Sequence, residues 1–445
     1  MSKNLNYKEI VDKILSLSTA DETEIMIFRG ENALTRFAQN YIHQNVAEDS
    51  ISIRVRTVIG KKTASASTNS LSDKSLKETV QTAINLTKQQ KDNEKLMPLQ
   101  GMQKYEFINK YFSATAKATP QYRANEVIKA VNMCKENGLT AAGIYETGLS
   151  EIVMANSNGL FVNDKATHSD FDISVMSDSG AGWSAKTDKN VKKINVEQVT
   201  RIAIEKAEKS RFPKEVEPGK YTVILEPSAV AELTLFMAWL GFNGMDYLEG
   251  TSFLCKYLGK KVFSDKLTII DDPKNEQTAG LAFDFEGTPT RKITLIENGI
   301  PKNFVTNRWI AQKTGVKNTG HATPLPSQNA YPSSMIIKHG EIELAKIIKD
   351  TEKAILVTRF HYTNVIDPME LIITGMTRDG LFLIENGEIT KPLRNMRFTQ
   401  SLIKAFSNIE EIGKEVEFAS GFFGGGFIVP GMKINNFNFS SKTDF

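Results

Sequence analysis

Apolar residues recur along the chain at two spacings, one typical of helices and the other typical of strands. Within residues 73–90 they follow each other at intervals of three or four, which indicates an amphipathic helix. Within residues 51–58 apolar and polar residues alternate, which indicates a half-buried strand. Helical spacing and helix-capping residues predict further helices over residues 7–18, 120–137, 196–211 and 228–240.

The order of predicted elements repeats within the first half of the chain. Residues 35–55 and 153–175 are similar in sequence, and each segment leads through a glycine-bearing strand pair into a helix. We interpret this pattern as a duplication of a unit made of two hairpins and a helix. In its first copy, short strands are expected at residues 24–28, 34–37, 41–46 and 51–58.

The later part of the chain is predicted to be mostly strands. The pentapeptide Leu-Ile-Glu-Asn-Gly occurs at residues 295–299 and 383–387, and Asn-Gly after an apolar run predicts a tight hairpin because both turn positions need a positive φ. Residues 241–259 are rich in glycine and predict irregular structure. The expected fold class is α+β, with an N-terminal duplicated β-hairpin/helix region followed by a β-rich, mostly antiparallel C-terminal domain.

Two polar stretches predict the domain boundaries. Residues 88–118 are polar and contain Pro98, which is typical of a linker. A second boundary is expected at the Glu-Val-Glu-Pro-Gly stretch, residues 215–219. The predicted divisions are an N-terminal α+β domain, a second α+β domain that we interpret as its repeat, and the β-rich domain, at residues 1–110, 111–217 and 218–445.

Composition and charge are those of an ordinary globular protein. The 445 residues are 40% hydrophobic, and their formal net charge is only +3, which argues against nucleic acid as a partner because phosphate binding needs a basic surface. The polar N-terminus has no signal-peptide pattern, and the densest apolar stretch, residues 233–242, is too short to span a bilayer. Cys134 and Cys255 form no disulfide framework, and both are expected in the core. We therefore expect a cytoplasmic protein without a membrane span.

Several common catalytic motifs are missing from the sequence. There is no Gly-x-Ser-x-Gly, which argues against an α/β-hydrolase, and no Cys-x-x-Cys. The five histidines never stand three or four residues apart, so no helix carries a two-histidine metal face. Any chemistry must therefore come from more isolated residues.

Glu232 is the most informative acidic residue, because the predicted helix around it is mostly apolar. Its side chain either points away from the core, pairs with a cation, or lies in a cleft with a raised pKa. His361 stands among polar residues, including Tyr362, and is either a cleft residue or an ordinary structural histidine. We treat Glu232 as a candidate catalytic residue, and His361 and Tyr362 as candidates for substrate binding.

A third candidate region is the segment at residues 394–401, in which basic and apolar positions alternate. Arg394, Arg397 and Thr399 are able to bind the carboxylate or the main chain of a peptide. The alternative is a solvated junction between a strand and a helix.

Several segments together resemble the TldD/PmbA family, which is also named after modulation of DNA gyrase. The similarity extends over nearly the whole chain in the family's order, and its most specific segments are residues 35–55, 61–83, 284–315, 361–389 and 394–401. The resemblance implies a cytosolic protein whose N-terminal and C-terminal regions form a dimer around a chamber. It also implies metal-dependent peptidase action on unfolded or small peptides.

The resemblance further implies where a zinc ion would bind. TldD-type members carry a His-Glu-x-x-x-His helix and a C-terminal cysteine as zinc ligands. Here Ala231 and Phe236 stand at the two histidine positions around Glu232, and residues 418–426 contain no cysteine. Because alanine and phenylalanine offer no donor atom, we expect no metal in this chain and zinc on a TldD-type partner.

Three functions follow from these residues. The leading hypothesis is a noncatalytic TldE/PmbA-like subunit of a two-component zinc peptidase, which shapes the chamber and binds extended peptides, as a heterodimer or a homodimer. The second is a hydrolase active on its own through a set such as Glu232, His361 and Arg397. The third is a nucleic-acid or gyrase-associated binding protein, against which the low net charge argues.

Overall fold

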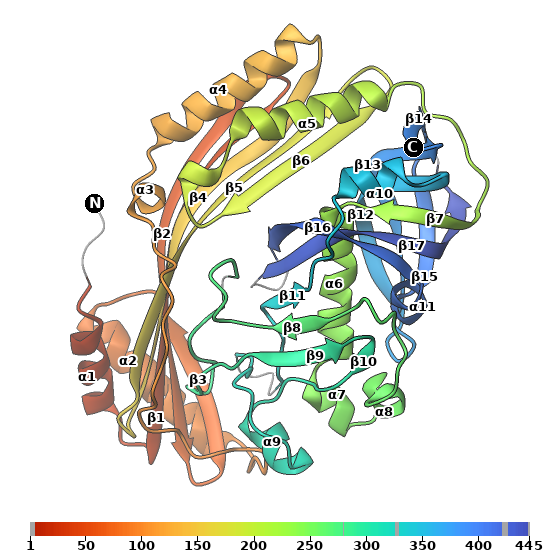
Figure 1. Cartoon of the computed structure of the whole chain (residues 1–445). Helices are drawn as coiled ribbons and strands as arrows, with labels where there is room; N and C mark the ends of the chain where they lie inside the picture. The colour runs from red at the N-terminus through yellow and green to blue at the C-terminus, as the bar shows by residue number, and fades with distance from the viewer. Residues whose placement is uncertain (1–4, 279, 325–328, 421–425, 444–445) are drawn as a thin grey trace.

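The first half of the chain forms one six-stranded antiparallel sheet. The computed structural model describes residues 5–278, 280–324, 329–420 and 426–443. The strands lie in the spatial order β3-β2-β1-β4-β5-β6, so the two segments predicted to be repeats meet where β1 pairs with β4 (Figure 1). They are β1 (Glu22–Ala38), β2 (Tyr41–Ile59), β3 (Lys62–Thr68), β4 (Thr140–Asn156), β5 (Phe161–Met176) and β6 (Ala181–Asp188).

Long strands replace several short strands expected from the sequence. Residues 24–28 and 34–37 belong to the single strand β1, and residues 41–46 and 51–58 belong to β2. The apolar pattern is interrupted in the middle of each long strand. The reason is that the helices form two separate hydrophobic cores with the sheet, one toward each end of it. Between these cores, β2 is exposed at residues 43–50, and polar residues are accommodated there.

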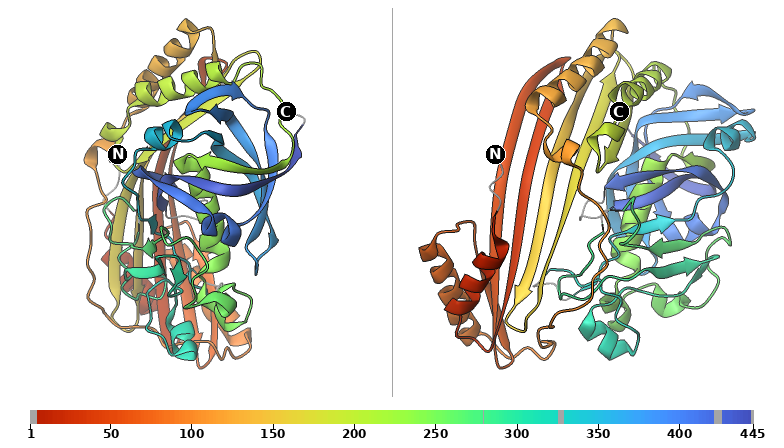
Figure 2. Two further views of the ribbon diagram at one scale, coloured as in Figure 1. Left: turned by 45° about the vertical axis from the view of Figure 1, so that its right-hand side comes forward. Right: turned by 60° about the vertical axis from the view of Figure 1, so that its left-hand side comes forward.

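Helices cover one face of this sheet, and the second half of the chain covers the other (Figure 2). Two helices pack on β1 and β2, and two pack on β4 and β5. Each half of the sheet has the order strand-strand-strand-helix, one strand fewer than the two hairpins expected in each unit. The helices are α1 (Tyr7–Leu17), α2 (Asp73–Gln89), α4 (Pro120–Glu136) and α5 (Val196–Lys209), with the short α3 (Ser113–Ala116) and η1 (Val191–Lys193).

The second half of the chain forms an 11-stranded sheet against the apolar helix α6 (Pro227–Gly241). Among the named strand pairs of the described ranges, only β7–β12 and β11–β17 are parallel, so the expectation of a β-rich, mostly antiparallel region is confirmed. The strands are β7 (Gly219–Leu225), β8 (Ile269–Asp271), β9 (Ile293–Glu297), β10 (Ile300–Pro301), β11 (Met335–Ile337), β12 (Lys353–Asp367), β13 (Ile372–Glu385), β14 (Glu388–Pro392), β15 (Met396–Ser401), β16 (Ile409–Ser420) and β17 (Gly426–Lys442). Further helices are α9 (Arg308–Thr314), α10 (Leu344–Lys349) and α11 (Leu402–Ser407).

Both Leu-Ile-Glu-Asn-Gly segments form the predicted hairpin turns. Asn298 and Gly299 have φ values of 47° and 79°, and they join β9 to β10. Asn386 and Gly387 have φ values of 52° and 81°, and they join β13 to β14. Asparagine tolerates this left-handed conformation and glycine adopts it freely, which is why the sequence signal is reliable here.

Two smaller expectations were wrong. Residues 241–259 are not irregular throughout, because they contain the short helices α7 (Gly244–Leu248) and α8 (Leu254–Tyr257). The side chain of Asn243 accepts a hydrogen bond from the amide of Met245 and so begins α7 locally. Cys134 is buried as expected, but Cys255 is exposed because one-turn α8 turns it toward solvent. No described helix is both long and apolar enough to cross a membrane.

The segment that connects α2 to α4 is held against the sheet by a buried ion pair. Lys110 Nζ lies 2.5 Å from Asp164 Oδ2 on β5, and the two side chains are only 1% and 6% exposed. The same ammonium donates a hydrogen bond of 2.6 Å to the carbonyl of Gly280 in the second half of the chain. The pair therefore fastens the N-terminal sheet to the C-terminal half.

Replacing Lys110 by methionine should destabilise the protein strongly. Asp164 would remain buried without its counter-charge, which costs about 3–5 kcal/mol of unfolding free energy. Urea unfolding measures this loss, and Asp164→Leu added to Lys110→Met should restore part of it. The control is Lys346→Met, which breaks an exposed pair with Asp350 and should cost less than about 1 kcal/mol. Equal losses in the two single variants would contradict the prediction.

Candidate functional site

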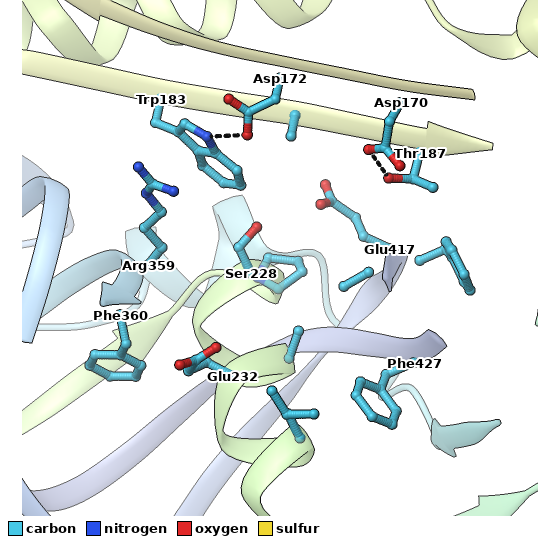
Figure 3. Close-up of a pocket in the computed structure, with 16 residues that line it drawn as sticks. Asp170, Asp172, Trp183, Thr187, Ser228, Glu232, Arg359, Phe360, Glu417 and Phe427 are labelled. Atoms are coloured by element: carbon cyan, nitrogen blue, oxygen red, sulfur yellow. Dashed lines mark hydrogen bonds between the residues drawn. The ribbon is translucent and has the colours of Figure 1, made fainter. Parts of the chain in front are cut away.

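A cavity of about 320 Å³ lies between the helix-free face of the N-terminal sheet and the C-terminal half. Strands β5 and β6 form one wall, and α6, β12, β16 and β17 form the other (Figure 3). Its lining comes from segments more than 200 residues apart in sequence, such as Asp170 and Glu417. The cavity therefore exists only when the two halves of the chain pack against each other.

Two open sheet edges lie against this cavity. β6 is the last strand of the six-stranded sheet, and it contributes Trp183, Ala185 and Thr187 to the lining. β16 pairs with β17 on one side, and it contributes residues 417–419. Within the described residues no second strand pairs with either segment, so main-chain groups are available on both sides of the cavity.

Four carboxylates from three elements line the cavity (Figure 3). They are Asp170 and Asp172 on β5, Glu232 on α6 and Glu417 on β16. Burial raises the pKa of all four, and that of Asp170 reaches about 6. The cavity therefore holds carboxyl groups whose charged forms are poorly stabilised by the protein alone.

Neutral hydrogen-bond donors orient the two aspartates. The Thr187 hydroxyl donates to Asp170 Oδ1 at 2.5 Å, and the Trp183 indole N–H donates to Asp172 Oδ2 at 2.7 Å. Both bonds favour the ionised form, and they lower each pKa less than burial raises it. These donors fix each carboxylate in place without neutralising its charge.

Arg359 on β12 lies near two of these carboxylates, Asp172 and Glu232, whereas Lys186 and Lys206 lie near Glu417. The Nε of Arg359 donates to Asp379 Oδ2 at 2.8 Å, and its guanidinium carbon lies 4.5 Å from the centre of the Trp183 ring. Its charge lowers the pKa of Asp172 and Glu232, but less than burial raises them. Because Arg359 is engaged by Asp379, it compensates the cavity carboxylates only in part.

Glu232 reaches the cavity because of its position on α6. Ser228, Ala231, Glu232 and Leu235 line the cavity at the three- and four-residue spacing of one helix face, whereas the rest of the helix is largely buried. Of the three alternatives for this residue, the cleft position with a raised pKa is therefore the observed one. Thr363 on the neighbouring β12 lowers the pKa of Glu232, but less than burial raises it.

The other predicted site residues lie outside this cavity. His361 Nε2 lies 2.6 Å from Arg378 Nη1, and burial together with Arg378 lowers the pKa of His361. Tyr362 is 71% exposed and has a positive φ of 51°. Arg397 is also exposed, so the structure does not bring Glu232, His361 and Arg397 into one cavity.

The remaining two candidates, Arg394 and Thr399, are also separate from Glu232. Arg394 Nη1 lies 3.6 Å from Glu215 and lines a different, more open cavity. The Thr399 hydroxyl lies between Thr374 and Ser440 at 3.2 and 3.1 Å. Within residues 394–401, Met396–Ser401 form β15, which leads directly into α11.

The positions expected to bind zinc in related proteins are occupied differently here. Ala231 lines the cavity, while Phe236 is 6% exposed and packs beside the Trp239 ring. Of the segment expected to hold a cysteine, residues 421–425 lie outside the described residues. Across the described ranges, no group of three or more His, Cys, Asp or Glu side chains is placed to hold a metal ion.

Sequence reasoning missed most of the cavity. The signal for Asp170 and Asp172 was present, because they alternate with Phe171 and Ile173, which face the helices on the other side of the sheet. Such alternation places both carboxylates on one face. Nothing in the sequence placed Glu417 opposite that face.

Comparison with known proteins gives consistent results over the whole chain. Residues 23–87, 104–211 and 218–441 match models described as PmbA/TldA metallopeptidase domain 1, central domain and C-terminal domain. A metalloprotease TldD homolog from Buchnera aphidicola subsp. Acyrthosiphon pisum is 27% identical over 94% of each chain. Metalloprotease PmbA from Escherichia coli O157:H7 is 28% identical over 50% of this chain and 47% of its own. The crystal structure of TldE from Thermococcus kodakarensis has the same fold, with a TM-score of 0.88 at 21% identity over 98% of this chain and 99% of its own.

Replacing Asp170 by asparagine should change how stability depends on pH. The pKa of Asp170 is raised from 3.8 to about 6, so its contribution to stability is full at low pH and is lost as pH rises through about 6. Asparagine still accepts the Thr187 hydrogen bond and never ionises. The variant should therefore match the original protein near pH 4 and exceed its urea midpoint near pH 8.

The matched control for this prediction is Asp178→Asn, which changes an exposed carboxylate on the same hairpin. It should leave the pH dependence of the urea midpoint unchanged. An Asp170→Asn profile parallel to that of the original protein would show that Asp170 ionises freely in the fold.

Proposed function

This chain belongs to the PmbA/TldA metallopeptidase family, and we propose that within it the chain is a noncatalytic, TldE/PmbA-like subunit of a two-component zinc peptidase. Its role is to hold unfolded or small peptides in extended form, while a TldD-type partner supplies the zinc ion and its activated water. We expect the pair to act in the cytoplasm.

The two open edges at the cavity are the observation that carries this proposal. Main-chain groups of β6 and of β16 near Glu417 lie free on opposite sides. An extended peptide pairs with such an edge through its own main chain, which gives affinity with little demand on its sequence. This mode of binding suits a subunit that accepts unfolded peptides of varied sequence.

The donor set around Glu232 does not fit a zinc ion. Ala231 and Phe236 stand at the positions of the expected histidine ligands, and neither side chain has a nitrogen, oxygen or sulfur donor. Glu232 alone offers one carboxylate, whereas zinc sites use three or four protein ligands. This supports a division of labour in which the metal belongs to the partner.

The carboxylates point to the kind of peptide that binds best. Asp170, Asp172, Glu232 and Glu417 surround a cavity in which Arg359 is already paired with Asp379. A cationic group of the substrate, such as a lysine or arginine side chain, would stabilise their ionised forms. We therefore expect a preference for basic peptides.

A third open edge is available for the partner subunit. β3 pairs with β2 only over Ile53–Ile59, so residues 41–52 of β2 pair on one side only within the described part of the chain. An exposed edge of this length is a template for pairing with another chain. It supports assembly with a TldD-type subunit or, in the absence of one, with a second copy.

Reconstitution with a TldD-type subunit tests the proposal directly. The isolated chain should contain no stoichiometric zinc by elemental mass spectrometry and should not cleave peptides. Mixed with the partner, it should increase the cleavage of an unfolded peptide above that of the partner alone. Absence of any increase would contradict the subunit role, and zinc near one per chain would contradict the division of labour.

Substitutions in the cavity separate binding from catalysis in the reconstituted complex. Asp170→Asn with Asp172→Asn should raise KM for a lysine-rich peptide about 5- to 10-fold with little change in kcat, as expected when uniform binding is lost. Glu232→Gln should likewise leave kcat within about twofold. The alternative, an enzyme active on its own, requires cleavage by the isolated chain that Glu232→Gln abolishes. The control is Asp178→Asn, which should change neither constant.

A further inference from the structure

Arg123 on α4 is a fully buried guanidinium with most of its donors unused. The side chain is 0% exposed. Its Nη1 donates to the Thr147 hydroxyl at 2.9 Å and to the Ala118 carbonyl at 3.2 Å. Its Nε and Nη2 are buried and have no hydrogen-bond partner. The N–H groups of Nε and Nη2 are therefore buried without an acceptor.

The charge of Arg123 is not balanced within the protein. Among the described residues, no carboxylate lies within ion-pair distance of it. By contrast, the two strongly buried arginines of the N-terminal sheet, Arg29 and Arg56, both pair with glutamates. Burial lowers the pKa of Arg123, and only Tyr145 opposes that effect. A buried charge without a partner is strongly unfavourable, so a compensating group is expected.

Two further buried hydroxyls without partners lie on the same face of the sheet. Tyr145 stands two residues before Thr147 on β4, so both side chains project toward α4. Thr35 on β1 is directly opposite Tyr145 in the strand register. Both Thr35 and Tyr145 are 0% exposed, and neither hydroxyl has a hydrogen-bond partner.

The Tyr145 hydroxyl is not satisfied by its aromatic neighbour. Burial, and after it Tyr122, raises the pKa of Tyr145. The two rings lie with their centres 6.3 Å apart, and the Tyr145 hydroxyl makes no hydrogen bond of acceptable geometry within the described residues. The Tyr145 hydroxyl therefore remains free to donate to a third group.

We propose that Arg123, Tyr145 and Thr35 form an internal binding site for one small monovalent anion of the halide type. The free Nε–H and Nη2–H groups are donors only, and each hydroxyl has one hydrogen to give. One negative charge would neutralise one guanidinium, and a compact anion needs no more than these few donors. A phosphate or a peptide carboxylate would bring extra acceptors into an apolar core and leave them unpaired.

The anion site is independent of the carboxylate cavity. Tyr145 packs against Phe171 in the core beneath α4 and α5, whereas the neighbouring Asp170 and Asp172 project from the opposite face. The bound anion would link α4 to β4 and β1, and its effect is therefore on stability. A test of the anion site is therefore independent of the proposed peptide-binding role.

Thermal unfolding of the full chain in different sodium salts tests the site. At equal ionic strength, chloride or bromide should raise the midpoint above that in gluconate by about 2–4 °C, because an anion that binds only the folded state stabilises it. Arg123→Met should abolish this difference, and Tyr145→Phe should reduce it. Lys135→Met, which removes one exposed charge from the same helix, should retain it.

A second experiment tests the site without a variant, in case Arg123→Met does not fold. Crystals of the original protein soaked in sodium bromide should show an anomalous peak within hydrogen-bond distance of Arg123 Nη2. Equal midpoints in halide and gluconate would overturn the proposal. So would an equal loss of the halide effect in Lys135→Met, or water without anomalous signal beside Arg123.

Discussion

The buried contact of Lys110 with Asp164 and the Gly280 carbonyl is the constraint on which the arrangement of this molecule depends. It joins the linker, β5 and the C-terminal half at one point. A buried ion pair of this kind adds little net stability over an apolar contact, but it tolerates no alternative geometry, because each partner is costly to leave alone. The pair therefore specifies how the helix-free face of the sheet meets the second half of the chain.

The properties of the cavity follow from that junction. Asp170 and Asp172 stand on a strand whose other face is apolar, and they would be ordinary solvated carboxylates without the C-terminal half (Figure 3). Covering them with α6, β12 and β16 removes water and raises their pKa values. The same packing brings two unpaired strand edges together. Charge and main-chain groups are thereby presented to one occupant.

The two faces of the N-terminal sheet bear buried groups of opposite charge. The face toward the C-terminal half holds carboxylates whose pKa values burial raises more than nearby cations lower them. The face toward α4 holds Arg123, two of whose nitrogens have no hydrogen-bond partner. Neither set satisfies the other, because the sheet lies between them. These are the two faces for which we propose a cationic peptide and a small anion as ligands, respectively.

The sequence by itself determined what depends on neighbouring residues. Helices such as α2 and α4, the Asn-Gly turns and the duplicated order of elements follow from local periodicity, capping and turn chemistry, and so does the placing of Glu232 on an apolar helix. Only the tertiary structure decided that Glu232 lines one cavity with Asp170, Asp172 and Glu417, and that His361, Arg394 and Arg397 stand elsewhere. These relations join residues far apart in sequence, and they are set by how sheet and helix faces pack, on which local patterns carry no information.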